Sequence, residues 1–359
     1  MNILTVNSGS SSLKACVFLD GGERQHFRFP LTPNTVESGL SAALNSLKNE
    51  LAHLRIDVIG HRFVHGGNCP DAARLLTPEE FQRLESIAHL APLHMESNLR
   101  GARFCQSAFE VPQIACFDTA FHHTLPESAW RLPIPNEYGL RRFGFHGLNY
   151  AHIARKLPEL LGEIAYNNVL IAHLGSGASL CCLQNLQSVA TTMGYTPAGG
   201  IPMATRSGDL DPGVMLELMK KVGADELIEL TYHRMGLLAL SQGESSDIAE
   251  LLKSDSANAR FAVQYFCAQA RAAIGAYAAQ LGGLNAIVFT AGIGEHASII
   301  REKIIEPLGF MNFALDAQAN EKHSTLLSTP HSKPILMIPA DEEAEIAYWV
   351  EKLNSSGFT

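Results

Sequence analysis

The stretch Asn7-Ser-Gly-Ser-Ser-Ser-Leu-Lys14 decides the fold class through the segments on either side of it. Ile3 to Val6 is short and apolar, which predicts a buried strand. Leu13 to Leu19 is apolar again and ends at Gly21-Gly22, which predicts a second strand and a turn. The polar stretch therefore joins two strands as a hairpin. In a P-loop or a Rossmann fold it would lead into a helix, and the chain contains neither GxxxxGK[ST] nor GxGxxG.

A similar layout recurs in the second half of the chain. Asn168 to Leu174 is predicted to form a strand, Gly175-Ser-Gly-Ala-Ser179 a loop of small residues, and Leu180-Cys-Cys-Leu183 a further strand. This weak internal repeat predicts two related domains. Strand-like and helix-like segments alternate along the chain, which is typical of the α/β class.

The other predicted elements follow from periodicity and from end signals. Thr77-Pro-Glu-Glu80 predicts a helix start, with Thr77 as N-cap and Glu80 closing a capping box. Helices are also predicted from Asp211-Pro212 to about Lys221 and over Asn258 to Leu281, which Gly282-Gly283 ends. Further strands are predicted at Ile56–Val64, Gln113–Phe117, Ala286–Thr290 and Ile335–Ile338.

Composition excludes several classes of protein. The 359 residues are 46% hydrophobic and 18% charged, which is enough apolar sequence for two cores and excludes wholesale disorder. A formal charge of −9 and a pI near 5.9 argue against a nucleic-acid or membrane partner. Seven cysteines without a CxxC pair predict reduced thiols. The first residues form a predicted strand in place of a signal peptide, and we expect a cytoplasmic protein.

Three strand ends carry small residues that expose backbone N–H groups: Asn7 to Lys14, Gly175 to Ser179, and Ala291-Gly-Ile-Gly-Glu295. Such segments bind phosphate oxygens. One of them alone would be a plain turn, but three, each at the end of a buried strand, predict a phosphate site.

Two arginines are candidates for holding an anion. Arg62 lies near the end of a predicted strand, and Arg206 lies in Met203-Ala-Thr-Arg-Ser-Gly-Asp-Leu-Asp-Pro212. Arginine suits bidentate capture of a carboxylate or a phosphate. The alternative is a surface ion pair, which the strand-end and glycine-bracketed settings disfavour.

Acidic groups and a histidine complete the candidates. Asp118 follows a predicted strand, as Glu342 and Glu343 do, and carboxylates there would suit magnesium, although each also suits a helix start. His146 lies between aromatic and glycine residues and is equally well interpreted as a structural donor. Zinc has no support, because HExxH is absent.

These segments together resemble the acetate kinase family. Asn7 to Lys14 and Met203 to Pro212 are similar to its two signatures. Five further motifs follow the family in order: His61-Arg-Phe-Val-His-Gly-Gly67, Phe117-Asp-Thr-Ala-Phe-His122, Arg142-Phe-Gly-Phe-His-Gly147, Ala172-His-Leu-Gly-Ser-Gly177 and Phe289-Thr-Ala-Gly-Ile-Gly-Glu295.

The resemblance covers essentially the whole chain and implies a fold. That fold is α/β, with two actin/hexokinase-like (ribonuclease H-like) domains whose mixed sheets are flanked by helices around a nucleotide cleft. The implied domains are residues 1–146 plus 345–359, with the acyl substrate, and residues 147–344, with the nucleotide.

The resemblance also implies the activity, which is the reversible magnesium-dependent transfer of the γ-phosphoryl group of ATP to acetate. It implies catalytic roles for Asp118, His146 and Arg206. The acetate site would be Arg62, Val64, Leu93, Phe145 and Pro197. Magnesium, or manganese in its place, would be held by Asn7 and Glu342. ATP or ADP would be bound by Lys14, His173, Leu174, Gly175, Ser176, Gly177, Asp247, Ile248, Ala249, Gly292, Ile293, Gly294, Glu295 and His296.

The chemistry of the reaction limits what these residues must do. Acetate is ionised at neutral pH, since carboxylic acids titrate near pH 4, so its oxygen can attack phosphorus without a general base. The site must hold two anions in line and neutralise charge. We therefore expect Asp118 to orient magnesium or an arginine, and Asp118→Asn to act mainly on metal use. The partners implied are acetate and ATP, with a homodimer by family analogy and neither nucleic acid nor membrane.

The chain departs from the family pattern at the nucleotide side. Ser176 and His296 stand where asparagines are usual, Ala249 stands for an arginine, and Asp341 precedes Glu342 in place of an asparagine. Nucleotide choice is therefore open. Three alternatives remain: a kinase of propionate or another short-chain acid, the same acyl site with another phosphoryl donor such as pyrophosphate, and a regulatory relative without turnover. Val64 favours the smaller acid, and Gly292 and Gly294 leave room for adenosine.

Overall fold

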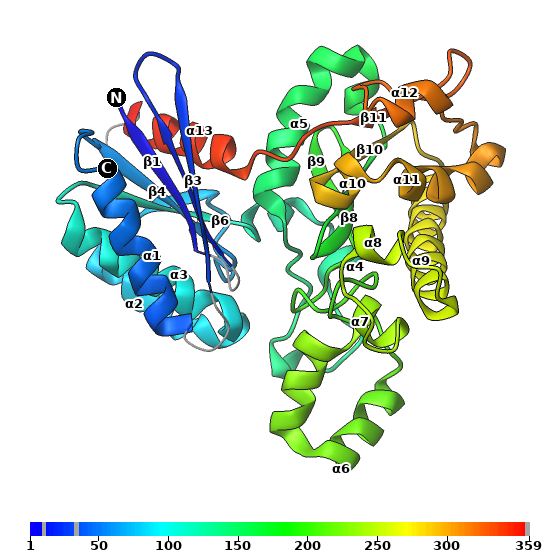
Figure 1. Cartoon of the computed structure of the whole chain (residues 1–359), viewed down its shortest axis with the longest axis horizontal. Coiled ribbons are helices and arrows are strands. Elements are labelled where there is room, and N and C mark those ends of the chain that lie inside the picture. Colours follow the sequence, from blue (N-terminus) through cyan, green and yellow to red (C-terminus); the bar gives the residue numbers. More distant parts are fainter. Residues whose placement is uncertain (9–11, 32–35, 356–359) are drawn as a thin grey trace. The chain divides into compact units, whose positions relative to one another are not determined.

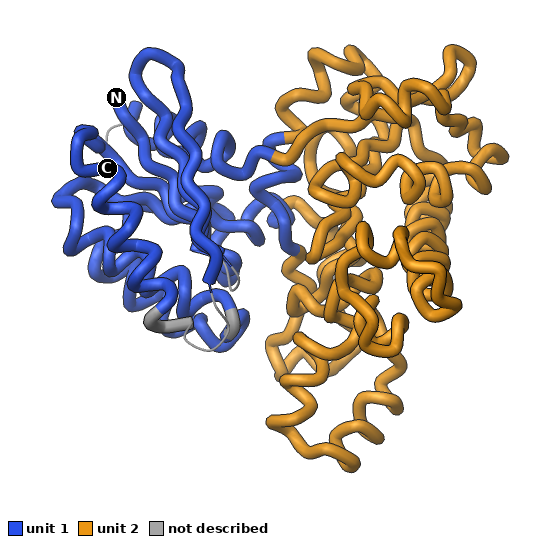
Figure 2. The backbone as a smooth tube through the Cα atoms, viewed as in Figure 1, with its two compact units in different colours: residues 1–123, 145–152, 341–359 blue, residues 124–144, 153–340 orange. Residues whose placement is uncertain are grey.

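A computed structural model describes residues 1–8, 12–31 and 36–355, and of residues 36–38 and Leu93 only the backbone is described. The chain forms two compact units (Figure 2). Unit 1 comprises residues 1–123, 145–152 and 341–359, and unit 2 comprises residues 124–144 and 153–340. The predicted domain limits differ from these units in three segments, which are residues 124–144, 147–152 and 341–344. The expected functional domains stay a prediction.

Among the described residues, unit 1 holds a six-stranded mixed sheet in the order β3-β2-β1-β4-β6-β5. β1 and β2 pair antiparallel from Ile3↔Phe18 to Ser8↔Leu13, so the predicted hairpin is confirmed, while Gly9 to Ser11 lie outside the described residues. β4 runs parallel to β1 and to β6. The strands are β1 (Ile3–Ser8), β2 (Ser12–Phe18), β3 (Arg24–Pro30), β4 (Val58–Phe63), β5 (Ala73–Leu75) and β6 (Gln113–Phe117).

Helices cover both faces of this sheet (Figure 1). On one face, α1 and α3 bury an apolar cluster that includes Leu4, Leu44 and Ile59. On the other face α13 packs through Ile346 and Val350. Gly60 in β4 permits that approach, because a Cβ there would lie 2.4 Å from the Ile346 side chain. The helices of this part are α1 (Val36–Glu50), α2 (Pro78–Ser86), η2 (Ala88–Leu90), α3 (Pro92–Ala108), η3 (Ala120–Thr124) and α13 (Glu342–Ser355).

The start of α2 agrees with the prediction in its N-cap and differs in its capping box. Thr77 is its N-cap, and its hydroxyl accepts a hydrogen bond from the Glu80 N–H at 3.2 Å. The second hydrogen bond of the predicted capping box, from the Thr77 N–H to the Glu80 carboxylate, does not form, so this part of the prediction is wrong. The Glu80 carboxylate binds Arg83 at 2.6 Å, and the Thr77 N–H donates to the Leu75 carbonyl. A guanidinium is the stronger partner for a carboxylate.

Unit 2 holds, in its described residues, a five-stranded sheet in the order β11-β10-β7-β8-β9. β7, β8 and β9 form an antiparallel meander, and β10 runs parallel to both β7 and β11. Unit 1 has the same arrangement in β1, β2, β3, β4 and β6. The strands are β7 (Val169–Leu174), β8 (Ala178–Gln184), β9 (Gln187–Thr191), β10 (Ala286–Thr290) and β11 (Ile335–Met337). The predicted internal repeat and the α/β class are confirmed.

The helices of unit 2 include the long α9, which starts at the Ser256 cap, ends at the left-handed Gly282 and packs on β8 (Figure 1). The range of α9 is Ala257–Leu281. The others are α4 (Glu127–Trp130), η4 (Asn136–Tyr138), α5 (Gly147–Leu161, its first residues belonging to unit 1), η5 (Gly162–Tyr166), α6 (Pro212–Glu229), η6 (Leu230–Arg234), α7 (Gly236–Leu240), α8 (Ile248–Leu251), α10 (Ala291–His296), α11 (Ser298–Ile305), η7 (Glu306–Met311) and α12 (Ala317–Glu321).

In the described part of the chain, no helix is long and apolar enough to cross a membrane. All seven cysteines are described, and each is a free thiol.

Candidate active site

A charged network lies at one edge of the unit 1 sheet, where β1, β4 and β6 end. Arg62 of β4 donates from Nε and Nη2 to one oxygen of Asp118, at 3.0 and 2.5 Å. Its Nη1 lies 3.3 Å from the Asn7 amide oxygen and 3.3 Å from a Glu342 carboxylate oxygen. Asn7 in turn donates to Glu342 at 3.1 Å. Four of the residues predicted from the sequence thus contact one another.

Asp118 is fixed from two sides. It follows β6, and its N–H donates to the Phe63 carbonyl at 3.0 Å. Its second carboxylate oxygen accepts from the Leu148 N–H, in the first turn of α5, at 3.4 Å. Gly147 makes this approach possible, because a Cβ there would lie 1.9 Å from the Asp118 carbonyl oxygen. A helix N-terminus favours a carboxylate, so this setting supports an ionised Asp118.

Burial and the neighbouring charges shift the pKa values of Arg62 and Asp118 in opposite directions. Burial raises the pKa of Asp118, and Arg62 opposes that rise. Burial would lower the pKa of Arg62, but the carboxylates of Asp118 and Glu342 outweigh it and raise this pKa above its usual range. The Asp118 side chain is fully buried and the Arg62 side chain is 17% exposed. We assign an ion pair, because a guanidinium stays charged and a hydrogen-bonded carboxylate beside it is stabilised.

Three of the four apolar residues predicted for acetate (Val64, Leu93 and Phe145) belong to unit 1, and Pro197 belongs to unit 2. Val64, directly after β4, and Phe145 are both buried. The Phe145 ring meets the edge of His65 at 5.7 Å, and its carbonyl oxygen lies 2.9 Å from His122 Nε2. His146 follows with a positive φ of 61°, a strained backbone for a residue with a side chain. The side chain of Leu93 is outside the described residues; its backbone lies in α3.

Lys14 lies opposite Asn7 in the β1–β2 ladder, and its side chain is exposed. The ladder therefore brings this cation to the same end of the sheet as the charged network. Its predicted contact with ATP phosphates stays a prediction.

In unit 2, Arg206 is a cation of a different kind. Its Nη1 donates to the Pro197 carbonyl at 3.0 Å and lies 3.6 Å from the Met203 sulfur. Burial lowers its pKa. Among the described residues of unit 2, no carboxylate pairs with it. Pro197, predicted for the acetate pocket, and Arg206, predicted for the phosphoryl group, thus lie in contact, and both roles stay predictions.

The loop that carries Arg206 is tied to the small-residue loop after β7. The Ala204 N–H donates to the Ser176 carbonyl at 3.1 Å. Within the β7–β8 loop, the Gly175 N–H donates to the Gly177 carbonyl at 3.1 Å. His173 and Leu174 end β7 directly before it. The predicted phosphate residues from His173 to Gly177 therefore lie beside the Arg206 loop.

The third predicted loop is wrong in one respect, because Ala291 to His296 form the short helix α10. Ala291 has a positive φ of 66°, so the chain turns sharply from β10 into that helix. Arg301, which the sequence reasoning missed, lies fully buried beneath it. Its Nη1 donates to the Gly294 and Glu295 carbonyls at 2.8 Å each, which satisfies carbonyls that the short helix leaves open. Burial lowers the pKa of Arg301 to about 10.

Asp247 serves α8 as its N-cap. Its carboxylate accepts from the Ala249 N–H at 2.6 Å and from the Glu250 N–H at 3.4 Å. Ile248 is buried and Ala249 is exposed. The local role of Asp247 is structural, and the predicted nucleotide contact of this segment stays a prediction.

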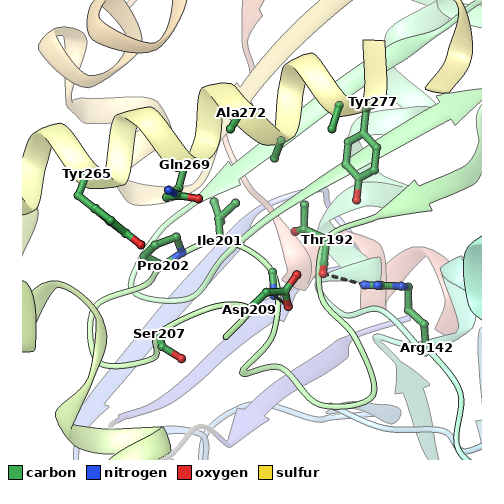
Figure 3. A pocket seen from close by; sticks show the side chains of 13 residues that line it. Arg142, Thr192, Ile201, Pro202, Ser207, Asp209, Tyr265, Gln269, Ala272 and Tyr277 are labelled. Atoms are coloured by element: carbon green, nitrogen blue, oxygen red, sulfur yellow. Dashed lines mark hydrogen bonds between the residues drawn. The ribbon is translucent and has the colours of Figure 1, made fainter. Parts of the chain in front are cut away.

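Unit 2 also contains a cavity of about 360 Å³ between α9 and the segment of residues 200–209, which includes Arg206 (Figure 3). Arg142 borders it and donates to the Thr192 carbonyl at 2.8 Å. Tyr265, Gln269 and Tyr277 of α9 line the other side. None of the residues predicted for acetate or ATP lines this cavity, so it is distinct from the candidate site.

The network in unit 1 offers oxygen ligands to a metal. In the described part of the chain, no group of three or more His, Cys, Asp or Glu side chains is arranged so that it could hold a metal ion. Asn7 and Glu342 provide one amide oxygen and one carboxylate, and the two side chains are in contact, because Asn7 Nδ2 donates to the Glu342 carboxylate at 3.1 Å. Magnesium keeps several waters and binds through one or two protein oxygens plus phosphates. The pair fits such a site and does not fit a metal cage made of protein alone.

Comparison with known proteins agrees with this geometry. The profile of the Acetokinase family matches residues 18–348. The chain belongs to the acetokinase family. Acetate kinase of Rhodopseudomonas palustris is 38% identical over 99% of both chains, and that of Bacillus cytotoxicus is 36% identical over 99% of both.

Solved structures of the acetokinase family have the same fold. A propionate kinase from Francisella tularensis superposes with a TM-score of 0.88 at 30% identity, covering 96% of this chain and 98% of that one. Porphyromonas gingivalis acetate kinase gives 0.84 at 31% identity, covering 98% and 99%. The two mixed sheets and their flanking helices are those of kinases in this family.

Proposed function

We propose that this chain transfers the γ-phosphoryl group of ATP to acetate, reversibly, giving acetyl phosphate and ADP. One observation carries the proposal: in a member of the acetokinase family, the Arg62 guanidinium is held by Asp118, Asn7 and Glu342 at the ends of three strands. A guanidinium has five N–H donors, and its four contacts with these partners leave one N–H of Nη2 for a carboxylate. An arginine whose position is fixed in advance binds a planar anion with little further loss of entropy.

The reaction needs no proton transfer. A carboxylate oxygen of acetate forms a bond to the γ-phosphorus, the bond to the β,γ-bridging oxygen breaks, and ADP leaves with the electron pair. Acetate is already ionised at neutral pH. The chain therefore has to align two anions and neutralise the charge on the transferring group.

Each of the predicted residues has a part in that task. Arg62 would hold acetate, whose methyl group Val64, Leu93, Phe145 and Pro197 would enclose. Arg206 and His146 would stabilise charge on the transferring oxygens, and the unpaired charge of Arg206 supports this role. The contacts of Asp118 support orientation of Arg62 over direct service to a metal.

Asn7 and Glu342 would hold magnesium, with manganese as an alternative. When bound, the metal supplies positive charge to the phosphates. Lys14 would add a further cation. The remaining nucleotide contacts would come from residues 173–177, 247–249 and 292–296. We also propose a cytoplasmic homodimer.

Propionate is a second candidate acceptor, because a propionate kinase superposes with a TM-score of 0.88. One methylene changes discrimination by only about 1–3 kcal/mol. The buried Val64 side chain favours the smaller acid.

Hydroxylamine trapping of acyl phosphate tests the proposal. The purified chain would be assayed with ATP, GTP and pyrophosphate over acetate, propionate and butyrate, with and without magnesium. We expect the largest kcat/KM for ATP with acetate. A larger value for propionate would select the second candidate, and no product with any pair would exclude a kinase.

A further inference from the structure

Asn98 of α3 connects two strand ends of the candidate site. Its side chain is almost fully buried, at 2% exposed. Its Oδ1 accepts from the Val64 N–H at 3.1 Å, and its Nδ2 donates to the Ser8 carbonyl at 2.9 Å. One amide therefore bonds the last residue of β1 and the first residue after β4.

This bridge lies where the two strands no longer pair with each other. The parallel ladder between β1 and β4 ends at Val6↔His61. Asn7 and Arg62 come next, and their side chains contact each other at 3.3 Å. The Asn98 amide thus holds the main chain just beyond both of these residues.

The approach of α3 to this point is close. Gly101 lies one turn after Asn98, and a Cβ on it would come within 2.4 Å of the Ser8 hydroxyl. The helix consequently reaches β1 with a small residue at one position and a two-way hydrogen-bonding side chain at the other. Asparagine is suited to this place because its amide both donates and accepts, whereas aspartate only accepts and leucine does neither.

We propose that Asn98 is a positioning residue that couples the end of β1, at Asn7 and Ser8, to Arg62 and Val64 of the predicted acetate site; this rests on the proposed function. Through Ser8 it acts on the end of β1, where Asn7 lies opposite Lys14 in the β1–β2 ladder. Through Val64 it acts on the acid pocket. Its two bonds make these effects separable by substitution.

Asn98→Asp separates them. The carboxylate still accepts from the Val64 N–H, but it places an oxygen against the Ser8 carbonyl oxygen in place of a donor. We expect KM for ATP to rise about 10- to 100-fold, the range for loss of a buried hydrogen-bond partner. KM for acetate should change less than about threefold. Asn98→Ala loses both bonds and should raise both KM values.

ATP binding by calorimetry on the same proteins needs no turnover and should weaken by the same factor in Asn98→Asp. Asn45→Asp is the control, because Asn45 makes an exposed amide bond within α1 of the same unit. A role confined to stability would lower the melting temperature of Asn98→Asp and leave both KM values and the ATP affinity at wild type, which would overturn the proposal. Equal effects on the two substrates in Asn98→Asp would also overturn it. Absence of turnover in the wild type would count against the proposed function alone, since calorimetry still decides the role of Asn98.

Discussion

The two units share one strand layout and differ in how their candidate cations are held. In unit 1, Arg62 is paired with the buried Asp118 and also contacts Asn7 and Glu342. In unit 2, the Arg206 side chain donates to a carbonyl oxygen and to a thioether, and no carboxylate among the described residues of that unit pairs with it. The same topology therefore carries a balanced charge network in one copy and an unbalanced cation in the other.

This difference separates the two things that a buried arginine can do. A paired arginine leaves no buried charge uncompensated, and it holds its position before any ligand arrives. An unpaired one costs stability until an anion binds, which is the arrangement expected of a group kept for catalysis. Activity alone would not distinguish the two arginines, but stability would.

Removal of Arg62 should have the largest effect. Arg62→Ala leaves the Asp118 carboxylate buried without its partner, so we expect a loss of about 3–5 kcal/mol in the free energy of unfolding. Loss of an anion-holding donor should lower kcat/KM for acetate roughly 100- to 1,000-fold. Urea unfolding and the hydroxamate assay measure the two quantities.

The double variant Arg62→Leu with Asp118→Leu is the matched control for Arg62→Ala, because it removes both charges together. It should regain most of the lost stability and none of the activity. The exposed Arg55, changed to lysine, should alter neither. If Arg62→Ala unfolds at the wild-type urea concentration, the paired network does not stabilise unit 1.

Removal of Arg206 should reduce activity without reducing stability. Arg206→Met keeps the apolar length of the side chain and removes an unpaired charge, so the free energy of unfolding should stay the same or rise. The fall in kcat should again be roughly 100- to 1,000-fold. A marked loss of stability in Arg206→Met would mean that the two cations are not different in kind.

Asp118→Asn tests what the carboxylate does for the network. The amide keeps the shape and still accepts from Leu148, but it no longer carries the charge that orients Arg62. Loss of a charged hydrogen bond is worth about 1.5–3 kcal/mol, so kcat/KM for acetate should fall roughly 10- to 100-fold. The magnesium concentration for half-maximal rate should stay near wild type. A large shift in that concentration would favour the metal role expected from the sequence.

Acid should weaken unit 1 through two buried histidines. Burial lowers the pKa of His61 and of His65 to about 4, below the ordinary 6.5. Between pH 6.5 and pH 4 the unfolded chain therefore binds more protons than the folded one, and stability falls as the pH falls. At pH 5 each histidine should account for about 2 kcal/mol of this loss.

Thermal unfolding of His61→Gln between pH 7 and pH 5 measures this effect. The variant should have a shallower decline with falling pH than wild type, and the exposed His53→Gln should decline like wild type. An equal decline in His61→Gln and wild type would show that His61 does not contribute.

The smallest effect is expected at the pocket wall. Val64→Ala should raise the ratio of kcat/KM for propionate to that for acetate about 10-fold, since one methylene is worth about 1–3 kcal/mol. It should leave KM for ATP unchanged. Ala249→Arg, in unit 2, is the reciprocal variant and should lower KM for ATP without changing the acid preference. If Val64→Ala changed KM for ATP, or Ala249→Arg changed the acid preference, acid and nucleotide selectivity would not be divided between the units.

Periodicity and end signals in the sequence were sufficient for most elements. β6 and β10 match the predicted strands, and the Gly282 stop of α9 and the Asp211 cap of α6 were predicted from single residues. The errors fall where a nearby arginine binds a group that the local pattern had assigned another role. Glu80 binds the guanidinium of Arg83 in place of the helix end, and residues 291–296 form a helix whose last carbonyls the buried Arg301 of the next helix satisfies.

The sequence by itself determined the α/β class, the repeated hairpin, the family and the candidate residues, because local patterns of apolar, glycine and charged residues encode them. Only the tertiary structure decided which of those residues touch: that Asp118 serves Arg62, that Arg206 has no acidic partner in its own unit, and that Asn98 joins Ser8 to Val64. These are contacts between residues 30 or more positions apart in the chain. They depend on strand register and on the close approach of α3 and α5 at Gly101 and Gly147, which no local pattern specifies.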